Sequence, residues 1–134
     1  MTLQQTFIVN KDLKMTCGKI CAQIAHGEVL YMKHVLNNFE YDIHTNTNSD
    51  MHKRYIEWLN ENNGPVGMMK KIVLKATRSE IEDLFVKIRK DKYMGYLIFD
   101  KGLTQVEPDS LTALCIEPLP EEQCKTLFGN LKLL

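Results

Sequence analysis

Residues 6–32, TFIVNKDLKMTCGKICAQIAHGEVLYM, decide the fold class of this chain. The stretch begins at 6–9 with an apolar, β-branched run, which is typical of a buried strand. A polar loop follows and leads to Gly18. From Lys19 onward, apolar residues recur at near-helical spacing, which predicts a helix that ends near Asn37. A strand, a glycine-containing loop and a helix in this order are the opening of an α/β unit.

The rest of the chain continues the alternation of helices and strands. The expected segments are an exposed Asn-rich loop over 37–50, a helix over 51–62, a strand over 71–76, a helix over 79–91, strands over 96–99 and 111–116, and a short helix over 121–128. Thr77 or Ser79 is expected to cap the third helix, with Glu82 spaced from Ser79 as in a capping box. This order predicts an α/β fold, a three-layer α/β/α sandwich around a four-stranded mixed β-sheet. The last two strands are expected to be antiparallel, because no helix joins them. Because no linker divides the sequence, residues 1–134 are predicted to form a single domain.

Composition excludes several classes of protein. Apolar residues make up 44% and charged residues 25% of the 134 positions, as in ordinary globular domains. No apolar run approaches the ~18 residues of a membrane span, and the N-terminus shows no secretory signal. Four irregularly spaced cysteines without such a signal favour reduced thiols and a cytoplasmic protein.

Charge is balanced overall but not along the chain. The chain has seventeen basic and seventeen acidic side chains, which argues against a strongly basic nucleic-acid binder. Residues 1–36 carry four basic and two acidic groups, and residues 70–92 carry eight and four. These two blocks indicate either a local basic face or solvated helix surfaces, and the sequence leaves both open.

Three polar residues of the first helix fall on one stripe. Lys19, Gln23 and His26 are spaced i, i+4 and i+7, beside the apolar face. A cation at a helix start is unfavourable by a few tenths of a kcal/mol, so Lys19 is unusual there. Together with free helix N–H groups it would form an anion site. The alternative is a solvated polar face.

A second candidate group follows the third expected strand. Asp100 ends that strand, and Gly102, Thr104 and Gln105 come directly after it. A carboxylate with hydroxyl and amide groups nearby could orient a water molecule or a ribose hydroxyl. The alternative is turn capping by Asp100, with Gly102 at a positive φ.

Metal, cofactor and nucleophile motifs are absent from the sequence. Cys17, Cys21 and His26 lack a fourth ligand and the usual pair spacing, so no zinc site is expected. Neither a dinucleotide-binding glycine motif nor a P-loop occurs, so no cofactor is predicted. Ser110 and Thr112 have no adjacent base, so no nucleophile elbow is predicted.

Four pieces of the sequence together carry a resemblance. They are Asp12-Leu13-Lys14-Met15 with Gly18-Lys19-Ile20, Ala22-Gln23 and Ala25-His26; Lys71-Ile72-Val73-Leu74-Lys75; Asp100, Gly102, Thr104-Gln105-Val106 and Pro108; and Gly129-Asn130-Leu131-Lys132-Leu133-Leu134. In these pieces the chain resembles the peptidyl-tRNA hydrolase 2 family, the archaeal and eukaryotic type. The pieces span nearly the whole chain in the right order, and it is their combination that is specific.

The resemblance implies hydrolysis of the ester between a peptide, or an N-blocked amino acid, and the 3′ ribose of tRNA, which recycles stalled peptidyl-tRNA. It implies no metal and no cofactor, a homodimer in the cytoplasm, and peptidyl-tRNA as partner. The catalytic positions it implies are Lys19, His26, Asp100 and Thr104, and the substrate-binding positions are Gly18, Gln23, Gln105 and Thr112. The alternatives are a non-catalytic or weakly active binding or regulatory protein on the same scaffold, and a hydrolase of a different ester.

Some positions depart from the family's pattern. Cys17 stands where a basic residue is usual, Lys101 and Leu103 alter the loop after Asp100, and Asp109 stands where Gly is usual. Because phosphate contacts dominate the affinity for nucleic acids, these changes predict weaker binding of tRNA.

Overall fold

The secondary structure follows the predicted alternation of helices and strands. A computed structural model describes residues 2–45, 49–60, 68–103 and 106–134. Its elements are β1 (Leu3–Asn10), α1 (Cys17–Thr45), α2 (Ser49–Asn60), β2 (Lys71–Ala76), α3 (Arg78–Lys90), β3 (Gly95–Asp100), β4 (Ser110–Ile116), β5 (Leu119–Pro120), α4 (Glu121–Phe128) and β6 (Lys132–Leu133).

The sheet is mixed, as predicted, but larger than predicted. Its strand order is β3-β4-β1-β2-β6, and β5 pairs with β1. Strand β1 is parallel to β2 and antiparallel to β4, and β3 and β4 are antiparallel, which confirms the expected orientation of that pair. The predicted number of four strands is wrong, because the sheet also contains β5 and β6. Each of these two strands pairs with its neighbour through only two residues. Strands this short carry no alternating pattern that a sequence could reveal.

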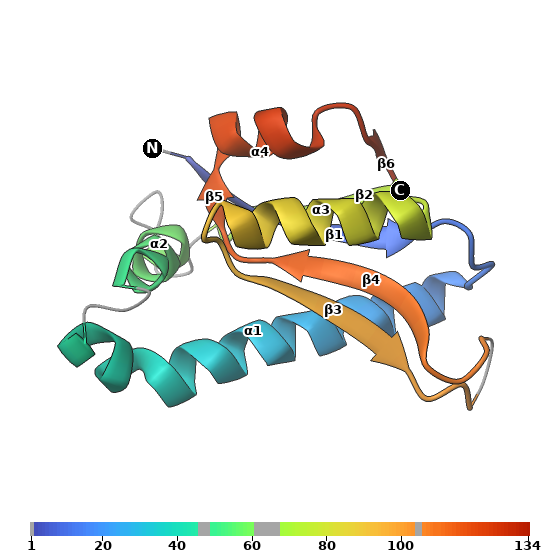
Figure 1. The fold of residues 1–134 in the computed structure, drawn as a ribbon, viewed down its shortest axis with the longest axis horizontal. Helices are drawn as coiled ribbons and strands as arrows, with labels where there is room; N and C mark the ends of the chain where they lie inside the picture. Colours follow the sequence, from blue (N-terminus) through green and yellow to red (C-terminus); the bar gives the residue numbers. More distant parts are fainter. Residues whose placement is uncertain (1, 46–48, 61–67, 104–105) are drawn as a thin grey trace.

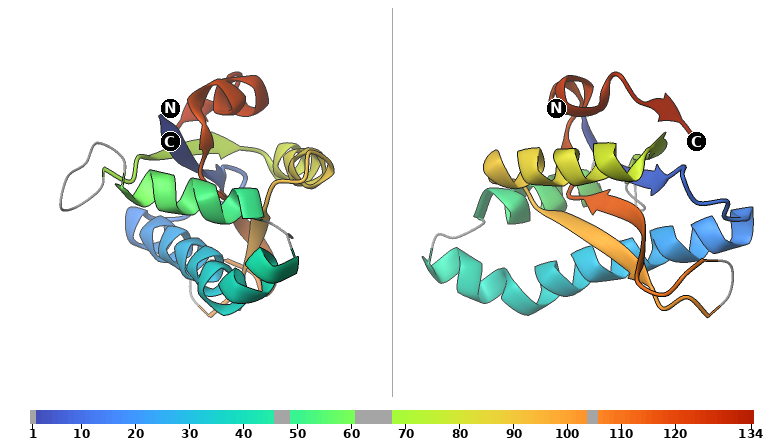
Figure 2. Two further views of the ribbon diagram at one scale, coloured as in Figure 1. Left: turned by 90° about the vertical axis from the view of Figure 1, so that its left-hand side faces the viewer. Right: turned by 45° about the vertical axis from the view of Figure 1, so that its right-hand side comes forward.

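Helices cover both faces of the sheet and form three layers (Figures 1 and 2). Neighbouring residues of β1 show why, because successive side chains of a strand point to opposite faces. Phe7 packs with Tyr31 of α1 and Trp58 of α2. Ile8 belongs to a second cluster, which includes Ile81 of α3 and residues of α4. The central strand is therefore buried on both sides, and the α/β/α sandwich is confirmed.

The expected loop over 37–50 is largely helical instead. Helix α1 continues to Thr45 and α2 begins at Ser49, while 46–48 lie outside the described residues. Asn, Asp and Thr favour loops only weakly, and tertiary packing often overrides such preferences. Here Tyr31 and Val35 are buried against the sheet and fix α1. Extending an anchored helix then adds one backbone hydrogen bond per residue.

Helix α3 begins one residue earlier than predicted, with a different capping box. The Thr77 side chain accepts a hydrogen bond from the Glu80 N–H at 3.2 Å, and the Glu80 carboxylate accepts one from the Thr77 N–H at 3.0 Å. The partner of the cap is therefore Glu80, and the predicted pairing of Ser79 with Glu82 is wrong. The hydrogen bond from the Thr77 N–H to the Glu80 carboxylate holds the pKa of Glu80 below its usual range.

This cap gives a first prediction, on stability. Thr77→Ala should lower the free energy of unfolding by ~1 kcal/mol, because an N–H group of the first turn loses its acceptor. Ser79→Ala, one residue into the same helix, is the matched control and should change it by less than about 0.5 kcal/mol. Urea denaturation of both variants measures the difference. Equal losses in the two would contradict the assigned cap.

Within the described part of the chain, no helix combines the length and apolar character required to cross a membrane.

Candidate active site

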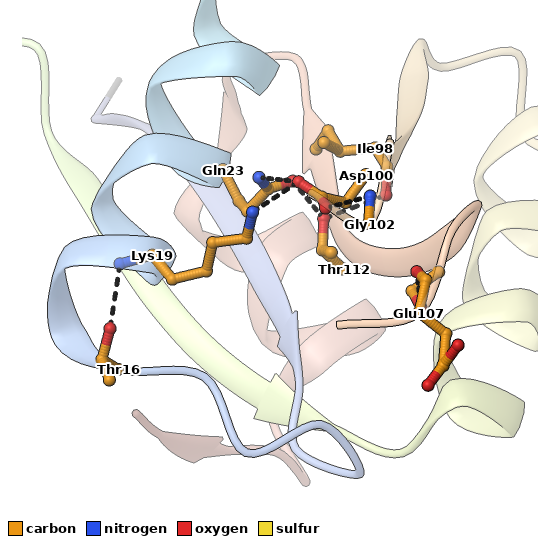
Figure 3. Close-up of polar contacts among 9 residues, drawn as sticks. Thr16, Lys19, Gln23, Ile98, Asp100, Gly102, Glu107 and Thr112 are labelled. Atoms are coloured by element: carbon orange, nitrogen blue, oxygen red, sulfur yellow. Dashed lines mark hydrogen bonds and ion pairs between the residues drawn. The ribbon is translucent and has the colours of Figure 1, made fainter. Parts of the chain in front are cut away.

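The start of α1 and the end of β3 meet at one edge of the sheet. Strands β1, β2 and β3 run in the same direction, since β3 is antiparallel to β4 and β4 is antiparallel to β1. Ligand sites of such sheets lie beyond the carboxyl ends of these strands. Lys19 in the first turn of α1 lies there beside Asp100, the last residue of β3 (Figure 3).

Three donors surround the Asp100 carboxylate. Its Oδ1 accepts hydrogen bonds from Lys19 Nζ at 2.6 Å and Gln23 Nε2 at 3.0 Å, and its Oδ2 accepts one from the Gly102 N–H at 2.7 Å. The side chains of Lys19 and Asp100 are only 13% and 11% exposed. The hydrogen bond from Lys19, followed by that from Gly102, holds the pKa of Asp100 below its usual range. The carboxylate is therefore ionised at neutral pH.

A buried hydroxyl fixes the orientation of Gln23. Thr112 Oγ1 donates to Gln23 Oε1 at the shorter distance of 2.6 Å, and the carbonyl oxygen of Ile98, at 3.1 Å, is a second acceptor for the same proton (Figure 3). Because the amide oxygen of Gln23 takes this hydroxyl, its nitrogen must point toward Asp100. Thr112 is fully buried and Gln23 is 6% exposed. This places Thr112 behind Gln23, as a residue that positions it.

The first turn of α1 is capped by Thr16. Its side-chain oxygen accepts from the Lys19 N–H at 3.4 Å, and its carbonyl oxygen accepts from the Ile20 N–H at 3.0 Å. No acidic residue stands in the first turn of α1. Gly18 is exposed, with open space where a side chain would begin. Lys19 therefore starts from the positive end of α1 and extends its ammonium to Asp100.

These groups open into a pocket of about 340 Å³. Its lining consists of Lys19, Gln23, His26, Phe99, Asp100, Lys101 and Leu103. The predicted stripe of Lys19, Gln23 and His26 therefore faces one cavity, with His26 exposed at it. Phe99 was missed by sequence reasoning, because a single aromatic residue in a strand gives no signal of a site.

The loop after β3 has the tight geometry expected for it. Gly102 adopts a φ of +76°, and a Cβ there would lie 2.2 Å from the Pro108 nitrogen. Asp109 also has a positive φ of 60°, which Asp tolerates better than most residues, and its N–H donates to the Asp100 carbonyl oxygen at 2.7 Å. Asp109 therefore adopts the left-handed backbone that usually favours glycine. Thr104 and Gln105 lie outside the described residues.

No group of three or more His, Cys, Asp and Glu side chains suited to a metal ion occurs among the described residues. Cys17 and Cys21 are exposed free thiols, and Cys115 and Cys124 are buried free thiols.

Comparisons with known proteins find the same kind of relative over nearly the whole length of this chain. The family model described as "Peptidyl-tRNA hydrolase PTH2" matches residues 3–134. A peptidyl-tRNA hydrolase of Saccharolobus islandicus (strain L.S.2.15 / Lassen #1) is 34% identical over 137 residues, covering 98% of this chain and 99% of the relative. Peptidyl-tRNA hydrolases of Saccharolobus solfataricus and Thermococcus sibiricus are 31% and 33% identical, covering 98% and 97% of this chain and 99% and 96% of the relatives.

Proposed function

The chain belongs to the peptidyl-tRNA hydrolase PTH2 family and is a hydrolase of peptidyl-tRNA, and we propose that the reaction takes place in the pocket between α1 and β3. The bond cleaved is the ester between the peptide and the 3′ ribose of tRNA. The observation that carries the proposed site is the shielded Asp100 carboxylate, held by Lys19 and Gln23 at the mouth of this pocket. Ester hydrolysis requires a positioned water, a proton acceptor and a stabilised oxyanion.

Lys19 is assigned to the oxyanion. When water attacks the ester carbonyl, negative charge develops on the carbonyl oxygen, and a fixed cation lowers the energy of that state. The ion pair with Asp100 keeps the Lys19 side chain in place, so little rearrangement is needed when the charge appears. The capped first turn of α1 adds its positive end to the same region.

Asp100 is assigned to the attacking water. A carboxylate oxygen has two lone pairs, and among the described residues Oδ2 accepts one hydrogen bond, from Gly102. We place the water at the other acceptor position of Oδ2. Because the pKa of Asp100 is lowered, its carboxylate is a weak base. Asp100 therefore orients the water and does not remove a proton from it.

His26 is assigned to proton transfer. It lines the same pocket, and histidine is the side chain that most often serves as a general acid or base in enzymes. In this scheme the water oxygen bonds to the carbonyl carbon, and the water proton passes to His26. As the ester bond breaks, that proton goes to the departing 3′ oxygen of the ribose. Thr104 keeps the catalytic role that the family resemblance implies, and Gly18 and Gln105 keep the implied substrate contacts.

Release of an N-acetylated amino acid from its tRNA tests the function directly. We expect steady turnover by the purified chain at low salt, falling as salt rises, because added salt weakens phosphate contacts. Folded protein that releases nothing from several different acylated tRNAs would contradict hydrolysis. Such a protein would fit the alternative, a binding protein on this scaffold.

Thr112 gives a prediction for the residue that orients Gln23. Thr112→Val keeps the shape but removes the hydroxyl, which leaves Gln23 Oε1 buried without this donor. We expect kcat to fall about tenfold with little change in KM, as for residues that act through a neighbour. Thr126→Val, on the exposed face of α4, is the matched control and should retain full activity. Full activity of Thr112→Val would contradict the positioning role.

We also propose a cytoplasmic homodimer. The cytoplasm is supported by the substrate, which ribosomes produce, and the homodimer by the family resemblance. Light scattering of the purified chain at several concentrations measures its mass, and a monomer throughout would contradict the dimer.

A further inference from the structure

Two large apolar side chains stand exposed beside the proposed reaction centre. Phe99 is 50% exposed and Leu103 is 84% exposed, although both line the pocket that contains Lys19 and Asp100. Neither belongs to the hydrophobic core on either face of the sheet. Packing within the described fold therefore does not explain why these positions are large and apolar.

Phe99 lies on β3 opposite an irregularity of the neighbouring strand β4. The register of β3 and β4 changes between Ile98, opposite Ala113, and Phe99, opposite Leu111, so that Thr112 is the extra residue. Such a bulge bends the strand that holds the extra residue, here β4, and bulges are common next to active sites. In a regular strand, Phe99 and Asp100 would point to opposite faces. Here both line one pocket at the free edge of β3, the outermost strand.

The chemistry of the lining distinguishes between two possible occupants. The carbon attacked at Lys19 and Asp100 is joined on one side to the acyl residue and on the other to the terminal adenosine of tRNA. An acyl side chain varies between substrates and is often neutral, whereas the adenosine is constant, flat and carries a 5′ phosphate. Phe99 and Lys101 line the same pocket, an aromatic face and a cation together. This combination suits a nucleotide, since bases stack on aromatic rings and lysines bind phosphates.

We propose that Phe99 is the stacking platform for the 3′-terminal adenine of the substrate, with Leu103 at its border and Lys101 beside the 5′ phosphate. This assignment rests on the proposed location of the reaction. It makes Phe99 a substrate-binding residue of the site, and it fixes which side of the pocket receives the tRNA. The acyl group then leaves toward the opposite side, away from Phe99.

Adenosine 5′-monophosphate is the probe, because it reproduces the terminal nucleotide without the ester. We expect it to bind the wild-type chain and to inhibit hydrolysis competitively. Phe99→Ala should weaken its binding about tenfold or more, as loss of one base–aromatic stack does. Phe99→Tyr should restore binding, whereas Phe99→Leu, which is apolar but not aromatic, should not. Val86→Ala, an exposed apolar residue of α3, is the matched control and should bind normally.

Substrates with acyl groups of different size test whether the acyl group, instead of the adenine, lies on Phe99. If the base stacks on Phe99, Phe99→Ala should lower kcat/KM by the same factor for N-acetylglycyl-, N-acetylleucyl- and N-acetylphenylalanyl-tRNA. A loss that grows with the acyl side chain would overturn the proposal and place the acyl group on Phe99. Unchanged binding of the nucleotide by folded Phe99→Ala would also overturn it.

Binding measured by calorimetry separates this inference from the proposed function. A chain that binds the nucleotide through Phe99 but hydrolyses nothing would support the stacking platform and contradict the hydrolase mechanism. A chain that hydrolyses through Lys19 and Asp100 but binds the nucleotide equally well without Phe99 would support the hydrolase mechanism and contradict the stacking platform. Circular dichroism of each variant confirms that it is folded before either comparison is made.

Discussion

Lys19→Ala should lower kcat for N-acetylaminoacyl-tRNA by ~10²-fold or more, the loss expected when one oxyanion-stabilising group is removed. The ammonium is the cation 2.6 Å from Asp100 in the pocket, and its position is fixed before substrate binds. An alanine leaves the developing negative charge to water, which must reorganise around it. The measurement is single-turnover release of the labelled N-acetylamino acid, which separates the chemical step from product release.

The control for Lys19→Ala is Lys33→Ala. Lys33 lies on the same helix and is exposed, so its removal takes away the same charge without touching the pocket. We expect Lys33→Ala to retain wild-type kcat, with at most a change in salt dependence. If Lys19→Ala raises KM but leaves kcat unaltered, Lys19 holds a phosphate of the tRNA rather than the oxyanion. Equal losses in the two variants would contradict a specific role for Lys19.

The convergence of Lys19 and Asp100 could be predicted because it follows from general rules. The apolar run at 6–9 and the helical pattern after Lys19 identify a strand followed by a helix, and alternation along the chain gives the α/β class. Carboxyl ends of strands that run in one direction gather at one edge, so a residue ending β3 meets residues at the start of α1. The direction of each strand and the edge of the sheet at which it ends follow from the order of helices and strands, and the sequence pattern predicts that order.

Contacts that depend on register could not be predicted. Thr112, which supports Gln23, is the extra residue where β3 and β4 change register. Nothing in the alternation of β4 marks that position, and nothing in the sequence of β3 marks Phe99 as a residue of the pocket. The length of α1 was missed for another reason. Its Asn-rich end favours a loop locally, whereas the packing of Tyr31 is a property of the folded chain.

Asp100→Asn should reduce kcat by ~10²-fold or more, although the side chain hardly changes in size. Lys19 Nζ, Gln23 Nε2 and the Gly102 N–H all donate to the carboxylate. An amide has one oxygen and one NH2 group, so one side of the substituted side chain would present a donor to another donor. The attacking water would lose its acceptor or Lys19 would lose its position. Asp83→Asn, at an exposed site of α3, is the matched control and should retain activity.

The pH dependence of stability tests the same carboxylate without any substrate. Because the pKa of Asp100 is lowered in the folded chain, its contribution to stability is present above the ordinary value of 3.8 and is lost as pH falls through the lower folded-state value. The difference in Tm between wild type and Asp100→Asn should therefore stay constant from pH 7 to about pH 5 and shrink below about pH 4. A difference that already disappears between pH 7 and pH 5 would show a carboxyl that takes up a proton near neutrality. Such a group could act as the general base itself, and His26 would lose the role assigned to it.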